Sequence, residues 1–405
     1  MKKILTTILC IAVICGACLA QSSKKAKYIF LFIGDGMGIS HVSLTEAYLA
    51  DKAGKTGSEY LSFSKFPYTG FVTTYSANSF TTCSSASGTA FSTGYKTKNL
   101  MLAVAPDSVT KLKSVSYKLK EKGFKIGISS NVAINHATPA VFYANNISRT
   151  AYYEIGLQLW QSGFDFFGGG SFMQDKGKGK NLQSLEEITK NNGYAITWGI
   201  KEINEISANV EKVVAFFNEN NAVQNLSYAI NRKGDEAKLS DIVEAEIKFL
   251  KARENKGFFI MAEGGIIDWC AHDNDAAGTV KEVIDLSEAV QVAIDFYEQH
   301  PDETLIIVTA DHETGGITLA RTGGGKNGFS SLDGQTGSVG ILDKENGRAI
   351  CDSINIAAGV GFSTKGHTGI VVPVYAVGAG AELFTGKFDN TDIPRKIMKA
   401  AGFEF

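Results

Sequence analysis

The sequence predicts an α/β fold in which a mostly parallel central sheet is covered by helices on both faces. Short continuous apolar runs, bounded by turn residues, recur along the chain and alternate with amphipathic stretches of helical period. Continuous apolar strands are typical of parallel sheets, because such strands are buried on both faces. The repeated succession of strand and helix therefore favours one layered α/β domain.

Five apolar runs are predicted as strands, and they are spread over the whole chain. The first, residues 28–33, leads directly into the glycine-rich stretch Gly34-Asp-Gly-Met-Gly38. The others are residues 125–129, 257–261, 304–308 and 371–377. The long intervals between these runs leave room for the helices that must connect parallel strands.

Two helices are predicted with defined limits. One apolar stripe of helical period ends shortly before Pro301, and it is formed by Val283, Leu286, Val290, Ala293 and Tyr297. A second helix is expected to run to Lys251, with Ser240 as its N-terminal cap.

The chain is expected to form one catalytic domain over residues 21–405, preceded by an export signal over residues 1–20. Two lysines precede an apolar run and a zone of small residues that ends at Ala20, which is the layout of a secretory signal. Cleavage after Ala20 would release a periplasmic or extracellular protein, whereas a lipid on Cys18 would leave it anchored, and both routes remain open. The apolar run is too short to span a membrane.

Composition excludes several other classes of protein. Hydrophobic residues make up 44% and charged residues 20% of the 405 residues, which is typical of globular domains and not of disordered or fibrous chains. A formal net charge of −2 gives no indication of nucleic-acid or membrane binding. Outside the signal, the three cysteines Cys83, Cys270 and Cys351 are too few and too widely spaced for a disulfide framework. Residues 321–365, rich in Gly, Ser and Asn, are predicted to form a loop-rich insertion over the core.

Metal-binding residue types collect at the ends of the predicted strands. They are Asp35 after the first strand, Glu263, Asp268 and His272 after the strand at 257–261, Asp311 and His312 after the strand at 304–308, and His367 before the strand at 371–377. Open parallel sheets bind ligands just beyond the carboxyl ends of their strands. Because zinc accepts imidazole nitrogen and carboxylate oxygen together, such a cluster can hold two ions close together. Two adjacent ions stabilise the attacking and leaving oxygens in a displacement at phosphorus.

A candidate nucleophile lies in the small-residue stretch from Thr81 to Ala90, which contains several serines. This stretch can begin a helix capped by Thr81 or Thr82, and a helix start presents free N–H groups and a positive dipole end to an anion. A serine hydroxyl becomes an effective nucleophile when a metal ion coordinates it. The alternative interpretation is an ordinary polar helix cap.

Together these segments resemble the alkaline phosphatase family. The blocks that carry the resemblance are Ile33-Gly-Asp-Gly-Met-Gly38, Ser84 through Gly94 with Lys96-Thr97, His136-Ala-Thr-Pro-Ala140 continuing to Arg149, Glu263 to His272, Thr309-Ala-Asp-His-Glu-Thr-Gly-Gly316 and Lys365-Gly-His-Thr-Gly369. The resemblance extends from about residue 28 to the C-terminus. It implies an alkaline-phosphatase-like fold, hydrolysis of small phosphate monoesters and a homodimer in which residues 321–365 form the crown-type insertion.

The resemblance also implies a role for each matching residue. Ser84 would attack the phosphorus atom and form a phosphoserine intermediate, and Arg149 would clamp two phosphate oxygens with its planar guanidinium. One zinc ion would be bound by Asp268, His272 and His367, and a second by Asp35, Asp311 and His312 together with Ser84. A third ion, normally magnesium, would lie among Asp35, Thr138 and Glu263.

Three residues depart from the pattern of the family. Cys83 stands where relatives often carry an acid that orients the arginine, so Arg149 is expected to be more mobile and to bind phosphate more weakly. His136 and Trp269 occupy variable positions near the third metal, which leaves the identity of that ion open.

Other functions have specific sequence requirements that this chain lacks. A sulfatase needs a modifiable Cys or Ser followed by Pro and Arg, and Ser84-Ser85-Ala86 does not supply this. A phosphodiesterase would have little use for Arg149 as a clamp on two free oxygens. A non-catalytic binding protein is expected to have lost the nucleophile, a metal ligand or the arginine, and all are present.

Overall fold

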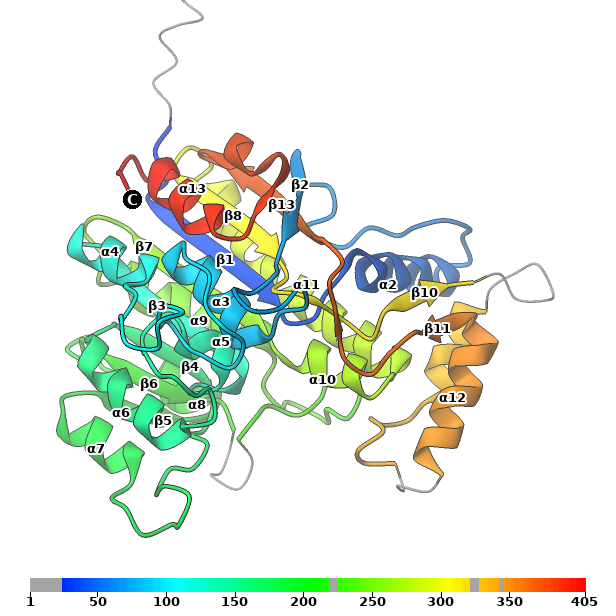
Figure 1. Ribbon diagram of the computed structural model, residues 1–405, viewed down its shortest axis with the longest axis horizontal. Coiled ribbons are helices and arrows are strands. Elements are labelled where there is room, and N and C mark those ends of the chain that lie inside the picture. The colour runs from blue at the N-terminus through cyan, green and yellow to red at the C-terminus, as the bar shows by residue number, and fades with distance from the viewer. Residues whose placement is uncertain (1–23, 219–223, 321–327, 343–345) are drawn as a thin grey trace, which may run out of the picture.

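The computed structural model describes residues 24–218, 224–320, 328–342 and 346–405, and a ten-stranded sheet runs through it (Figure 1). The strands are β1 (Tyr28–Gly34), β2 (Tyr68–Thr73), β3 (Lys125–Ala133), β4 (Phe166–Gly170), β5 (Ala195–Trp198), β6 (Val213–Phe216), β7 (Phe258–Gly264), β8 (Thr304–Thr309), β13 (Val372–Gly378) and β14 (Gly386–Asp389). Their order across the sheet is β14-β2-β13-β8-β1-β7-β3-β4-β6-β5. The predicted export signal lies outside the described residues.

The sheet is mostly parallel, as predicted, and β1 lies near its middle. This strand is buried along its whole length and pairs in parallel with β7 on one side and β8 on the other. Strand β13 is the exception, since it runs antiparallel to both β8 and β2. All five predicted strands are present, but the strand at 371–377 is followed by one more, β14, which pairs with β2.

Helices cover both faces of the sheet. They are α2 (Ile39–Lys52), α3 (Ser84–Thr93), α4 (Val115–Glu121), α5 (Ala137–Ala140), α6 (Tyr152–Ser162), α7 (Leu185–Asn191), α8 (Gly199–Asn204), α9 (Leu239–Lys251), α10 (Ile266–His272), α11 (Ala276–Gln299) and α13 (Asp392–Ala400). Helices α9 and α11 pack together on one face, and α3, α4, α5 and α13 contact one another on the other (Figure 1). This arrangement confirms the predicted α/β architecture.

The two predicted helices are found, but one begins earlier than expected. Helix α11 ends two residues before Pro301, and its predicted apolar stripe is packed into the core. Helix α9 begins at Leu239, so Ser240 lies inside its first turn and the prediction that it caps the helix is wrong. The carboxylate of Asp241 accepts the free backbone N–H of Lys238 instead, at 2.8 Å, and a charged acceptor stabilises a helix start well.

The described part of the segment 321–365 contains the 3-10 helix η1 (Phe329–Gly334), the helix α12 (Gly347–Ala358) and the strand β11 (Val360–Phe362). Strand β11 pairs antiparallel with β10 (Ile317–Leu319), so the two ends of this segment lie side by side. The carboxylate of Asp275, at the start of α11, accepts hydrogen bonds from the Gln335 side chain and the Val339 backbone. The twelve-residue helix α12 was not predicted from the Gly- and Ser-rich composition.

The described residues include three cysteines, Cys83, Cys270 and Cys351, and all three are buried free thiols. Within the same residues no helix is both long enough and apolar enough to cross a membrane.

Candidate active site

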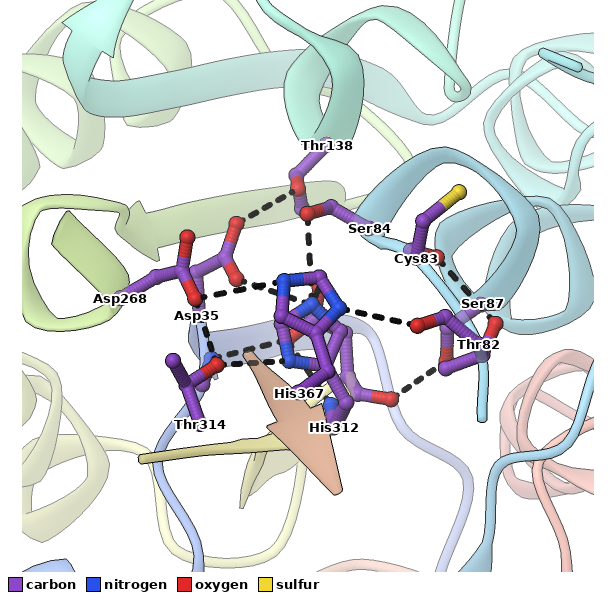
Figure 2. A network of polar contacts seen from close by, with 12 residues as sticks. Asp35, Thr82, Cys83, Ser84, Ser87, Thr138, Asp268, His312, Thr314 and His367 are labelled. Atoms are coloured by element: carbon purple, nitrogen blue, oxygen red, sulfur yellow. Dashed lines mark hydrogen bonds and ion pairs between the residues drawn. The ribbon is translucent and has the colours of Figure 1, made fainter. Parts of the chain in front are cut away.

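Polar side chains from six segments meet at the carboxyl ends of β1, β7 and β8 (Figure 2). In the sheet register, Ile33 of β1 lies between Glu263 of β7 and Thr309 of β8, so the three strands end at the same level. The predicted site residues that follow these strands are therefore brought together. The small strand β12 (His367–Thr368) pairs with β9 (Glu313–Thr314) and delivers His367 to the same place.

The first group of predicted ligands is formed by Asp268, His272 and His367. One carboxylate oxygen of Asp268 lies 3.3 Å from Nε2 of His272, because both residues are on one face of α10. The other oxygen lies 3.6 Å from Nε2 of His367, and the two Nε2 atoms are 3.2 Å apart. Asp268 and His367 also lie close to His312, and one ligand atom from each of these three residues falls within 4.8 Å of the other two. His272 contacts this group through Asp268 and His367.

The second group is centred on His312, which is fully buried. Its Nε2 lies 3.3 Å from Oδ1 of Asp35 and 3.3 Å from Oδ2 of Asp311. Both of these oxygens are buried and have no hydrogen-bond donor. Burying a carboxylate oxygen without a partner is costly, so a cation between these atoms fits the residues present.

The third group consists of oxygen atoms only. Thr138 donates its hydroxyl to Oδ2 of Asp35 at 3.3 Å. Glu263 is fully buried, and its Oε2 accepts the hydroxyl of Ser130, whereas its Oε1 has no partner. Magnesium prefers oxygen ligands, and this set of carboxylates and a hydroxyl fits that preference.

The histidines present the same ring nitrogen to the site. Nδ1 of His272 contacts the backbone carbonyl of Lys365, and Nδ1 of His367 lies 2.9 Å from that of Thr82. A carbonyl can only accept, so each Nδ1 carries a proton and each Nε2 is the ring nitrogen directed toward the acids of the site. Nδ1 of His312 lies 3.2 Å from the hydroxyl of Thr314, and its Nε2 is directed toward the acids in the same way (Figure 2).

Burial of several acids close together at the site opposes their ionisation. Burial, reinforced by Asp311 and Asp268, raises the pKa of Asp35 well above its ordinary value. Burial also raises the pKa of Glu263 to about 7 and that of Asp311 to about 8. Carboxyls with pKa values raised in this way are stabilised as anions when a divalent cation binds beside them.

Among the remaining predicted ligands, the pKa is raised in one residue and lowered in the others. Burial opposes ionisation of Asp268, but the hydrogen bond with His272 and the nearby histidines hold its pKa below the ordinary value. The same hydrogen bond raises the pKa of His272 to about 9. Burial lowers the pKa of His312 and of His367, so both favour the neutral form that binds metal ions.

Ser84 is the first residue of α3 and is almost fully buried. Its Oγ lies 3.3 Å from Nε2 of His312 and 3.4 Å from NH1 of Arg149. The residue at the N-cap is Cys83, so the predicted cap at Thr81 or Thr82 is wrong. The hydroxyl of Thr82 donates to the carbonyl of Cys83 instead, and no side chain blocks the free N–H groups at the start of the helix.

Arg149 faces Ser84 without a carboxylate partner. Its NH2 lies 3.4 Å from Nε2 of His136, and among the described residues it forms no ion pair. His136 is the N-cap of α5 and meets Trp269 edge to face, with ring centroids 6.0 Å apart. Burial lowers the pKa of His136 to about 3, so its imidazole is neutral.

Three residues that support the site were not predicted from the sequence. Thr314 donates its hydroxyl to Asp268 at 2.6 Å and contacts His312, and Ser130 contacts Glu263. Thr314 lies within the block 309–316, but a threonine hydroxyl carries no sequence signal of its own.

The third residue, Ser87, is one turn after Ser84 on α3. Ser87 donates its hydroxyl to the backbone carbonyl of Asp311 at 2.6 Å and accepts from Asn390 at 3.0 Å. Lys96 in turn donates to the amide oxygen of Asn390 at 2.7 Å. These bonds fix α3 against the end of β8, and Asn390 comes from a part of the chain that the sequence did not connect with the site.

Comparisons with known proteins agree on one family. The family model described as alkaline phosphatase matches residues 26–403. Alkaline phosphatase 3 of Bacillus subtilis is 32% identical over 439 residues, which covers 94% of this chain and 91% of the relative. The structure of alkaline phosphatase from the Antarctic bacterium TAB5 has 31% identity and a TM-score of 0.77, and covers 94% of this chain and 100% of that chain. Two variants of the TAB5 enzyme, with a histidine replaced by Glu or Asp, contain magnesium in the M3 site and match with a TM-score of 0.76 at 31% identity, covering 95% of this chain and 100% of theirs.

Proposed function

The chain belongs to the alkaline phosphatase family, and from that premise we propose that it hydrolyses phosphate monoesters through a phosphoserine intermediate on Ser84. Membership makes it a metal-dependent phosphoric monoester hydrolase. The observation that carries the proposed mechanism is the position of the Ser84 hydroxyl at an open helix start, between the imidazole of His312 and the guanidinium of Arg149.

The proposal assigns two zinc ions and one magnesium ion to the three groups of ligands. The first zinc site would be formed by Asp268, His272 and His367, the second by Asp35, Asp311, His312 and Ser84, and the magnesium site by Asp35, Thr138 and Glu263. Mixed imidazole and carboxylate ligands suit zinc, and the oxygen-only group suits magnesium. When bound, such ions act as Lewis acids that neutralise developing charge on phosphoryl oxygens and lower the pKa of a coordinated hydroxyl group or water.

The residues of the chain would bind and orient the phosphate group. Arg149 would donate two parallel hydrogen bonds to non-bridging oxygens, which a planar guanidinium does better than an ammonium group. The free N–H groups at the start of α3 would add a positive dipole end beside the same oxygens. Ser84 would thereby face the phosphorus atom with the leaving oxygen on the opposite side.

Two displacements complete the proposed reaction. In the first, a bond forms between Ser84 Oγ and phosphorus while the bond from phosphorus to the alcohol oxygen breaks, and the alcohol leaves with a proton. In the second, water attacks the same phosphorus atom, the Oγ–P bond breaks, and inorganic phosphate and the free serine hydroxyl are formed. Splitting one difficult step into two easier steps is the advantage of a covalent intermediate.

The identity of the third ion depends on the surroundings of His136. The TAB5 variants with magnesium in the M3 site carry Glu or Asp in place of a histidine, and we propose that His136 occupies the corresponding position here. A neutral imidazole and the indole of Trp269 supply no negative charge for a hydrated magnesium ion. We therefore expect weaker magnesium binding than an acidic neighbour would give.

The variant Ser84→Ala tests the mechanism. It should abolish the phosphoenzyme and lower kcat by about a thousandfold or more, with slow residual hydrolysis supported by the remaining groups. The neighbouring substitution Ser85→Ala is the matched control and should retain a trappable phosphoenzyme. Acid quenching during turnover, followed by peptide mass spectrometry, locates the phosphate. Phosphate on Ser85 or Cys83 would overturn the assignment.

We also propose that the protein is a homodimer with residues 21–405 as one catalytic domain and residues 321–365 as its crown-type insertion. Large apolar side chains are exposed on β2 and on segments beside it, namely Phe71, Tyr75, Phe80 and Ile370. Clusters of exposed apolar residues of this kind are typical of protein interfaces. Light scattering coupled to size-exclusion chromatography measures the oligomeric state, and a monomer at all concentrations would exclude the dimer.

Finally, we propose export to the periplasm or the extracellular space by the signal at residues 1–20. The catalytic ions and the domain would then act outside the cytoplasm. Mass spectrometry of the N-terminus of protein isolated from the producing cell tests this proposal. A new N-terminus after Ala20 would indicate a released protein, a lipid-modified Cys18 would indicate an anchored one, and an intact Met1 would refute export.

A further inference from the structure

Asn99 and Leu100 form a short segment between two parts of the site. The segment hydrogen-bonds the turn that precedes Ser84, and it also hydrogen-bonds the backbone of Arg149. Both polar atoms of the Asn99 side-chain amide form hydrogen bonds. Oδ1 accepts the backbone N–H of Cys83 at 3.1 Å, and Nδ2 donates to the carbonyl of Thr81 at 3.0 Å. These two bonds fix the backbone of the turn that leads directly into Ser84.

Leu100 connects this turn with the arginine. Its backbone N–H donates to Sγ of Cys83 at 3.1 Å, and its carbonyl accepts the backbone N–H of Arg149 at 2.8 Å. Beyond it, Leu102 and Asn146 exchange two backbone hydrogen bonds of 2.8 Å each, which continues the contact between the two segments. Only Leu100 separates the thiol of Cys83 from the backbone of the arginine.

The backbone of Leu100 is held in an unfavourable conformation. Its φ is +73°, in the left-handed region that a residue with a branched side chain adopts rarely and with backbone strain. The residue is 59% exposed, so the packing of its side chain offsets little of this strain. The hydrogen bonds to Cys83 and Arg149 are the interactions that compensate for it, and strain of this kind is concentrated at functional sites.

The guanidinium of Arg149 needs such support. Its two contacts, with Ser84 Oγ and with Nε2 of His136, are both long at 3.4 Å, and within the described residues no carboxylate pairs with it. A free arginine side chain loses rotamer entropy when it is ordered on a ligand. A fixed backbone reduces the range of positions from which the side chain must be ordered.

We propose that Cys83, Asn99 and Leu100 form a brace that positions Arg149 relative to Ser84 and thereby sets the affinity of the site for the phosphate group. The three are positioning residues, since none of them touches the reacting atoms. In this brace the sulfur of Cys83 is a hydrogen-bond acceptor, which explains how the site can orient its arginine without an acid at position 83. The inference rests on the proposed roles of Ser84 and Arg149.

The pair Cys83→Ala and Cys83→Ser tests the role of the sulfur atom in the metal-loaded enzyme. Alanine removes the acceptor for the N–H of Leu100 and also the 3.2 Å contact of the sulfur with Oγ of Ser85, whereas a serine oxygen can still make both. Cys83→Ala should raise the inhibition constant of inorganic phosphate and the KM of a small monoester about fivefold to tenfold, as expected for one lost hydrogen bond. Cys83→Ser should return both constants to within about twofold of wild type. Ile147→Ala is the matched control, because Ile147 is exposed two residues before Arg149 and lies outside the brace, and it should leave both constants unchanged.

A double-mutant cycle decides whether the effect passes through Arg149. In an Arg149→Ala background, Cys83→Ala should change the inhibition constant of phosphate by less than about twofold, because the group that the brace positions is absent. Equal effects in both backgrounds would overturn the proposal, as would an unchanged constant for Cys83→Ala. Circular dichroism of each variant during heating identifies one that fails to fold, and Asn99→Ala then replaces it in the same cycle.

The experiments distinguish a failure of the brace proposal from a failure of the proposed phosphoserine mechanism. If Ser84 is not the nucleophile, Ser84→Ala retains a phosphoenzyme regardless of the brace. If the brace is wrong, the phosphoenzyme still forms on Ser84 and Arg149→Ala still weakens phosphate, while Cys83→Ala does not.

Discussion

Glu246 of α9 is a buried acid outside the catalytic site, and its replacement by Gln should change how stability depends on pH. The residue is fully buried, and Oε2 accepts the hydroxyl of Ser129 at 2.7 Å, whereas Oε1 has no partner. The carboxyl group packs directly against β3, because a Cβ atom at Gly127 would lie 2.0 Å from Oε1. Within the described residues no cation forms an ion pair with it. Burial therefore raises the pKa of Glu246 well above its ordinary value of 4.5.

The sign and size of the effect follow from proton linkage. Below pH 4.5 the carboxyl is protonated in the folded and the unfolded chain, so its contribution does not vary with pH. Above that pH the unfolded chain releases the proton and the folded chain retains it, which favours unfolding as the pH rises. The free energy of unfolding should fall by about 1.4 kcal/mol per pH unit until the folded pKa is reached. Glu246→Gln has no proton to release and should lack this contribution.

Urea unfolding of the metal-loaded protein from about pH 5 to about pH 9 measures the difference. Subtracting the wild-type curve from that of Glu246→Gln cancels the titration of the metal ligands, which are common to both. Glu244→Gln is the matched control, since Glu244 is exposed on the same helix, and it should parallel the wild type. If Glu246→Gln also parallels the wild type, the buried carboxyl is not retained in its protonated form and the reasoning fails.

Three further predictions concern the catalytic site. Chelation should remove activity, and added zinc should restore it. Activity should also rise with pH, because histidines bind metal ions only when they are deprotonated. Full activity after exhaustive chelation would contradict the metal-dependent mechanism. Arg149→Lys should raise the inhibition constant of inorganic phosphate about tenfold, because the bidentate contact is lost while the charge remains, and a diester should be affected less. Equal losses for monoester and diester would indicate a general folding defect. His136→Asp should lower the magnesium midpoint about tenfold at fixed zinc, as measured by titration of metal-stripped protein. An unchanged midpoint would mean that Asp35, Thr138 and Glu263 alone determine the affinity.

The sequence alone predicted the layered α/β fold and the ends of the strands at which the site lies. Apolar runs such as residues 28–33 and 304–308 report burial directly, because a central parallel strand has no solvent-facing side. The residues that follow them, Asp35, Asp311 and His312, were identified for the same reason, since the carboxyl ends of parallel strands share one edge of the sheet. The short strands β2 and β4 to β6 were not predicted. Strands β2 and β5 have mixed burial, β4 contains three glycines, and β6 is apolar throughout but only four residues long, so each carries little periodic signal.

Only the tertiary structure decided which segments, distant along the chain, contact one another. The hydrogen bonds of Asn390 with Ser87 and of Leu100 with Cys83 and Arg149 join groups whose side chains are individually unremarkable in type. The left-handed backbone of Leu100 cannot be predicted from a leucine, because local preference opposes it and the surrounding hydrogen bonds impose it. The sequence determines which chemistry is available through the kinds of side chain it supplies, whereas the distances that make a buried set of acids and histidines fit metal ions exist only once the sheet has aligned its strands.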